Sequence, residues 1–180
     1  RGIFIAFILF SLLSMTWMGA RMPETLAVEN RRPLQMALLT SALKELFSHP
    51  SVRVSILVQS LAMAMLFTML MLVQPIYFDV YDRAESFPYW FGLISLIAGT
   101  ASLLNANIVM RFGMRNVVTL SFAIQIVISS IMLGLSLFPP QDALYFGLFL
   151  VFQASVFFLA GLTFGNLNAL AMEPLGHIAG

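Results

Sequence analysis

Five long stretches without a charged side chain constrain this sequence most strongly. All of its Lys, Arg, Asp and Glu residues, 9 basic and 8 acidic, fall outside them. Each stretch reaches the length of about 20 residues that a helix needs to cross a bilayer. The sequence therefore predicts an all-α integral membrane protein with five transmembrane helices, over residues 2–20, 54–78, 86–110, 116–141 and 143–172.

The composition excludes a soluble domain. The chain is 60% hydrophobic and 9% charged, with a mean hydropathy of +0.93, whereas soluble domains carry about 25% charged residues. A net charge of +1 gives no indication of a nucleic-acid partner. The chain has no cysteine, which excludes disulfides and cysteine-ligated metals. We expect a lipid bilayer as its surroundings, and we expect neither a metal nor a cofactor.

The basic residues predict the orientation of the helices. Residues 21–53 hold five of the nine Lys and Arg residues, and the turn at 111–115 holds two more. Only Arg1 and Arg83 lie on the other side. Because cytoplasmic loops carry the excess of positive charge, we expect residues 21–53 to form a cytoplasmic loop. Residues 33–47 predict a short amphipathic helix within it. The predicted divisions are a helix at 1–20, this loop at 21–53 and a bundle at 54–180.

Two of the predicted helices carry a polar and aromatic face. A polar group in hydrocarbon is unfavourable unless it faces a cavity or a polar neighbour, so these faces are candidates for a substrate pathway, with packing between helices as the alternative. Pro75 allows a kink near one end of the first face. The candidate residues are Gln59, Met63, Gln74 and Tyr77 in the helix at 54–78, and Gln153, Phe157, Phe164 and Asn168 in the helix at 143–172.

Small residues and a glycine turn predict contacts between helices. Gly92 and Gly99 belong to one stripe of small residues, and Gly161 and Gly165 form a small-xxx-small pair. Such residues let helix backbones approach closely in lipid. The turn containing Arg111, Gly113 and Arg115 joins two helices on the cytoplasmic side, and Gly113 can adopt positive φ there. We expect these three turn residues to act in gating.

Other polar groups have simpler interpretations. Asp79, Asp82 and Glu85 recur every three residues, but this spacing matches no calcium loop, so a solvated loop is favoured over a cation site. His177 is interpreted as a loop residue. Residues 2–20 lack the basic segment of a signal peptide. The five stretches contain no acid or base, so an enzyme is not expected.

Three short motifs resemble those of one transporter family. They are Pro-Glu-Thr-Leu at 23–26 followed by Arg-Arg-Pro-Leu at 31–34, Arg-Phe-Gly-Met-Arg at 111–115, and the segment from Asn168 to His177-Ile178-Ala179-Gly180. They are similar to segments of major facilitator superfamily transporters, most of all to drug–proton antiporters of the bicyclomycin/chloramphenicol-resistance type. The aspartate of the family's loop signature is absent from 111–115, which argues against a gate built on it.

The resemblance implies a partial major facilitator bundle that spans helices six to ten of twelve. It implies proton-coupled efflux of small amphiphilic compounds, as in multidrug resistance, across a bacterial inner membrane. It also implies that the N-terminal half of the same chain is a partner and supplies the residues for proton coupling. The alternative is an importer of a sugar or another metabolite. We expect Gln153 to be the polar anchor of the pathway.

Overall fold

The structure is a computed structural model that describes residues 1–22, 35–138 and 142–175. The motifs at 23–26 and 31–34 and the residues His177, Ala179 and Gly180 lie outside the described ranges. The chain divides into two units, Arg1–Thr40 and Ser41–Gly180. The first unit holds α1 (Gly2–Arg21), which has no buried residue. Helix α2 (Met36–Ser48) crosses the boundary between the units, and it lies where the sequence predicts an amphipathic helix.

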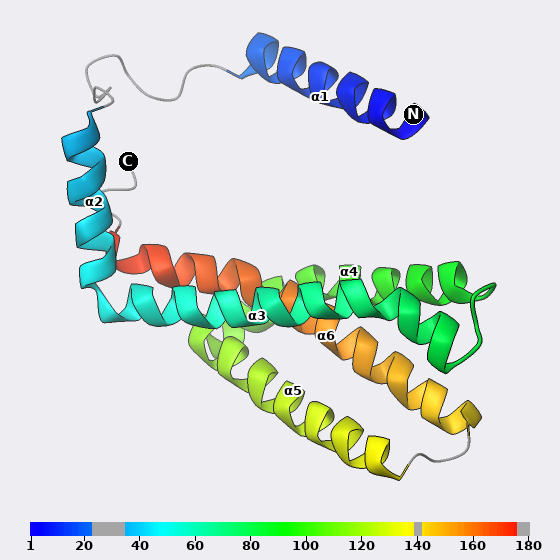
Figure 1. The fold of residues 1–180 in the computed structure, drawn as a ribbon. Helices are drawn as coiled ribbons and strands as arrows, with labels where there is room; N and C mark the ends of the chain where they lie inside the picture. The colour runs from blue at the N-terminus through cyan, green and yellow to red at the C-terminus, as the bar shows by residue number, and fades with distance from the viewer. Residues whose placement is uncertain (23–34, 139–141, 176–180) are drawn as a thin grey trace. The chain divides into compact units, whose positions relative to one another are not determined.

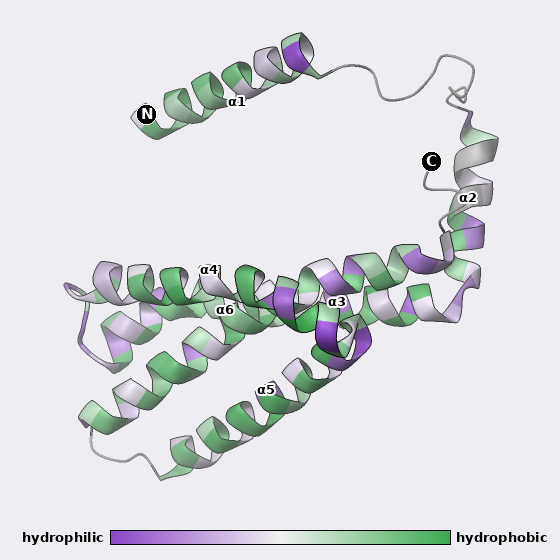
Figure 2. Cartoon of the chain, turned by 180° about the vertical axis from the view of Figure 1, so that it is seen from behind, coloured by the Kyte–Doolittle hydropathy of each residue, from purple (hydrophilic) through white to green (hydrophobic). Residues whose placement is uncertain are grey.

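The second unit contains the remaining four long helices. They are α3 (Pro50–Pro75), α4 (Phe87–Phe112), α5 (Met114–Leu137) and α6 (Asp142–Met172), with a short 3-10 helix, η3 (Glu173–Leu175), at the end. With α1, five helices in the described ranges are long and apolar enough to span a membrane. The fold class predicted from the sequence is confirmed, and Figure 2 shows apolar residues along most of each long helix.

Helix α3 begins four residues before the predicted stretch, because proline suits the first turn of a helix, where no backbone N–H is needed for a helical bond. The helix changes its hydrogen-bonding pattern at Pro75. Proline cannot donate a backbone hydrogen bond, and the chain continues after it as a single π-helical segment, η2 (Ile76–Val80). The N–H of Tyr81 donates to the carbonyl of Ile76 at 3.2 Å, which closes this wider turn.

Helix α6 is the centre of the second unit (Figure 1). It contacts α3, α4 and α5, whereas these three contact one another far less. Its buried residues therefore point in several directions instead of forming one stripe. They are Phe146, Phe149, Gln153, Val156, Leu159, Ala160, Thr163, Asn166 and Leu167.

A single glycine joins α4 to α5. Gly113 adopts φ 79° and ψ 152°, and it is both the C-cap of α4 and the N-cap of α5. Its N–H donates to the carbonyl of Val109 at 2.9 Å, while its own carbonyl accepts from the N–H of Val117 at 3.2 Å. The positive φ predicted for this residue is confirmed. Beside the turn, Arg115 pairs with Glu173 at 3.8 Å, and both side chains are exposed, so this pair adds little to stability.

Candidate functional site

Helices α3, α4 and α6 line one open pocket of about 680 Å³. We refer to it as the α3–α4–α6 pocket. Hydrophobic and aromatic side chains dominate its wall, and a single carboxamide and two hydroxyls provide the polar side chains. The lining residues are Leu66, Leu70, Phe91, Ser95, Ala98, Ser102, Asn105, Phe157, Ala160, Gly161, Phe164 and Gly165.

Helical periodicity explains why these residues meet. Phe91, Ser95, Ala98, Ser102 and Asn105 are three or four positions apart, so they share one face of α4. The residues from α6 follow the same spacing from Phe157 to Gly165, and Leu66 and Leu70 are one turn apart on α3. The pocket is therefore built from three helix faces and needs no loop to form it.

Helices α4 and α6 approach each other closely at Gly161, which lines the α3–α4–α6 pocket. A Cβ atom added to Gly161 would lie 2.8 Å from the Cβ of Ala101 and 3.5 Å from the carbonyl oxygen of Ala98. Gly161 thus allows the close contact between α4 and α6, as its small-xxx-small pair suggests. The other three glycines proposed for packing, Gly92, Gly99 and Gly165, have no such neighbour within 4 Å in the described part of the chain.

Two aromatic rings from different helices meet at the pocket wall. The ring centroids of Phe91 and Phe157 are 5.9 Å apart, and the planes of the rings are at 89°. This edge-to-face arrangement is one of the favoured geometries for aromatic pairs. The hydroxyl of Ser95 donates to the carbonyl of Phe91 at 2.8 Å, so it is already engaged within its own helix. The Phe91–Phe157 pair therefore gives this wall its apolar character.

The described structure places the residues singled out in the sequence at different sites. Phe157, Phe164, Gly161 and Gly165 line the α3–α4–α6 pocket. Gln59 and Met63 are half-buried, Gln74 and Asn168 are exposed, and none of these four is among the lining residues. Tyr77 and Gln153 come together elsewhere.

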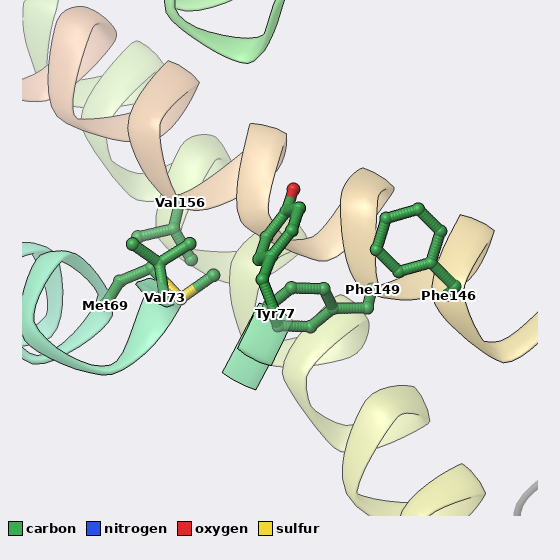
Figure 3. Packing of buried hydrophobic residues seen from close by; sticks show 6 residues of the cluster. All are labelled: Met69, Val73, Tyr77, Phe146, Phe149 and Val156. Carbon is green, nitrogen blue, oxygen red and sulfur yellow. The ribbon is translucent and has the colours of Figure 1, made fainter. Parts of the chain in front are cut away.

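Tyr77 and Gln153 form a buried polar contact between η2 and α6. Both side chains are fully buried, and the hydroxyl of Tyr77 donates to Oε1 of Gln153 at 3.0 Å. The ring of Tyr77 packs edge-on against those of Phe146 and Phe149, with centroids 5.5 and 5.9 Å away (Figure 3). Nε2 of Gln153 has no hydrogen-bond partner among the described residues. A buried donor in this state opposes the packing by about 1–3 kcal/mol.

Sequence reasoning missed Phe91 and the pair formed by Asn105 and Asn166. Nδ2 of Asn166 donates to Oδ1 of Asn105 at 2.8 Å, and Asn166 is only 4% exposed. Helical spacing was the available signal. Phe91 lies four residues before Ser95, and Asn105 lies three residues after Ser102, so these side chains share one face of α4. No group of His, Asp and Glu side chains in the described ranges is arranged to hold a metal ion.

Comparison with protein-family models matches residues 1–180 to the Major Facilitator Superfamily. Comparisons with curated proteins and with solved structures found no match. The family model covers the whole chain, and its members are transporters that cross the membrane many times. The five candidate spans and the apolar pocket between three of them agree with that architecture. The chain therefore belongs to the major facilitator superfamily and is a multi-pass membrane protein of the secondary-transporter type.

Proposed function

We propose that this transporter exports small amphiphilic compounds, including drugs, in exchange for protons, and that the α3–α4–α6 pocket is part of the substrate path. One observation carries the proposal: the pocket is lined by Leu66, Leu70, Phe91, Phe157 and Phe164, with one carboxamide at one end. Apolar and aromatic walls with few polar groups suit ligands that vary in shape. The motif resemblance at 111–115 and at 168–180 supports the drug–proton antiporter type.

An importer of a sugar or another metabolite is the second candidate. A sugar presents many hydroxyls, and each buried hydroxyl needs a partner in the protein. Asn105, Ser95 and Ser102 are the polar side chains that line the α3–α4–α6 pocket, and the hydroxyl of Ser95 already bonds its own helix. This supply of donors and acceptors favours the amphiphile over the sugar.

Replacing Phe157 with alanine is expected to weaken the binding of many different compounds by a similar amount. The ring contributes to the pocket wall and contacts Phe91, and removing one buried large side chain lowers binding by about 1–3 kcal/mol. The measurement is the export of a panel of structurally distinct drugs by the full-length protein. Proton exchange is read in the same proteoliposomes as a substrate-dependent change in internal pH.

Leu159→Ala is the matched control for Phe157→Ala. Leu159 lies on the same helix and is 3% exposed, but it does not line the α3–α4–α6 pocket. Its loss should lower the amount of folded protein more than it changes which drugs are exported. An unchanged drug profile for Phe157→Ala at equal protein level would show that this face serves packing only.

We further propose that α2 and the turn at Gly113 face the cytoplasm, in keeping with the basic residues beside them. The chain lacks cysteine, so single cysteines at Ser48 and Glu85, both exposed, can be labelled without interference. A membrane-impermeant maleimide added to intact cells should label the cysteine at position 85 and leave that at position 48 unlabelled until the membrane is opened. Labelling of position 48 from outside would reverse the proposed orientation.

A further inference from the structure

The only carboxamide that lines the α3–α4–α6 pocket is Asn105, and a second carboxamide holds it in place. Asn105 is half-buried, and it lies seven residues before the end of α4 at Phe112, which is about 10 Å along the helix axis. Asn166 on α6 is 4% exposed and contacts it directly. The pair therefore sits at one end of an otherwise apolar pocket.

The hydrogen bonds of Asn166 fix which of its atoms is nitrogen. One atom of its amide lies 2.7 Å from the carbonyl oxygen of Leu162 and 2.8 Å from the amide of Asn105. A backbone carbonyl only accepts, so the atom beside it must be Nδ2, and both of its protons are then in use. The atom of Asn105 that receives the second proton must be Oδ1.

Asn105 is oriented by this contact. Because the bond from Asn166 turns Oδ1 of Asn105 toward α6, its Nδ2 is the atom with an N–H left to donate to other groups. The contact from this nitrogen to Oδ1 of Asn166 is 3.5 Å, at the outer limit for a hydrogen bond. The second N–H of Asn105 has no partner among the described residues. Asn105 thus presents a donor to the pocket.

We propose that Asn105 selects ligands that carry a hydrogen-bond acceptor, such as a carbonyl or ether oxygen, and that Asn166 is the positioning residue that turns the Asn105 donor toward the ligand. This inference rests on the proposed function of the α3–α4–α6 pocket. An acceptor on an aromatic ligand pairs with Nδ2 while its rings pack on Phe164, which also lines the pocket and lies two residues before Asn166 on α6. A ligand without an acceptor leaves the amide desolvated and unpaired, which lowers its affinity.

Three tricyclic probes of nearly equal shape test the proposal: fluorenone carries one acceptor, carbazole one donor, and fluorene neither. Binding of each radiolabelled probe is measured to the full-length protein in lipid nanodiscs, with empty nanodiscs subtracted. The unmodified protein should bind fluorenone about 2- to 10-fold more tightly than fluorene, the range expected for one neutral hydrogen bond. Asn105→Leu should abolish this ratio. Asn107→Leu is the matched control, because Asn107 is exposed, bonds its own helix at Leu103 and does not line the pocket.

Asn166→Asp keeps the test decisive if Asn105→Leu does not fold. A buried carboxyl without a charged partner stays protonated, so the hydroxyl oxygen in the place of Nδ2 donates its one proton to Leu162 and can only accept from Asn105. The amide of Asn105 then turns its oxygen to the pocket, and preference should move from fluorenone to carbazole. A fluorenone preference that survives both substitutions would overturn the assignment of Asn105.

The proposed function fails in a different way. If none of the three probes binds, or if Phe157→Ala leaves the affinity for fluorene unchanged, the pocket itself is not a ligand site. If fluorene binding depends on Phe157 but the fluorenone preference does not depend on Asn105, the pocket stands and the role of Asn105 is refuted.

Discussion

Replacing Gly161 with alanine should force α6 away from α4 and reduce transport severely, although it adds a single methyl group. The new Cβ would lie 2.8 Å from the Cβ of Ala101, closer than two carbon atoms approach without repulsion. Ala101 is fully buried, so it cannot turn aside. Overpacking of this kind opposes folding by about 1–3 kcal/mol, and it also changes the walls of the α3–α4–α6 pocket. Thermal unfolding of the protein in detergent and drug export report the two effects.

Two further variants separate the steric effect from any other property of glycine. Gly165→Ala adds the same methyl one turn along α6, where nothing lies within 4 Å, and it should leave the stability near its original value. Ala101→Gly combined with Gly161→Ala removes the clashing methyl and should restore most of the lost stability. Normal stability for Gly161→Ala alone would show that α4 and α6 are not held at this distance.

Gly113→Val is expected to abolish transport while substrate affinity stays roughly intact. The backbone of Gly113, at φ 79° and ψ 152°, lies in a region that only glycine occupies readily, and another residue there raises the energy by about 1–3 kcal/mol. No atom lies within 4 Å of the added Cβ, so the effect comes from the backbone. Relieving the strain changes the angle at which α5 leaves α4, and Gly113 itself does not line the α3–α4–α6 pocket.

The measurement for Gly113→Val compares drug binding with drug export in the same preparation. Gly134→Val is its control, because Gly134 lies inside α5 without positive φ and also has open space around it. Loss of binding together with a normal rate of switching between inward-facing and outward-facing states would contradict the assignment of this turn to gating.

The sequence predicted the helices well because membrane spans depend on local properties. A run of about 20 apolar residues fixes a span without knowledge of its neighbours, and all five predicted spans are present. Gly113 was predictable for the same reason, since its positive φ belongs to a tight turn between two spans. Helix ends were less certain: Arg53, used to end a loop, lies inside the first turn of α3.

The candidate site was harder to predict because it depends on which helices touch. The faces of α3 and α6 were judged by polarity, which drew attention to Gln153 as an anchor for the ligand. In the structure Gln153 is buried and bonded to Tyr77. Helical periodicity alone does not distinguish a face that packs on a neighbouring helix from a face that lines a pocket. The role of Asn105 could not be predicted from the sequence, because it depends on contact with Asn166 on another helix.

The central position of α6 has a consequence for the order in which the protein is made. Helix α3 makes only slight contact with α4 or α5, and α4 and α5 contact each other less than each contacts α6. Before α6 is made, contacts among α3, α4 and α5 therefore do little to hold these three helices together. At about 5–20 residues per second, the 31 residues of α6 take about 2–6 seconds to synthesise. Throughout that interval α3, α4 and α5 lack the helix that packs against all three, so their mutual packing is completed only when α6 enters the membrane.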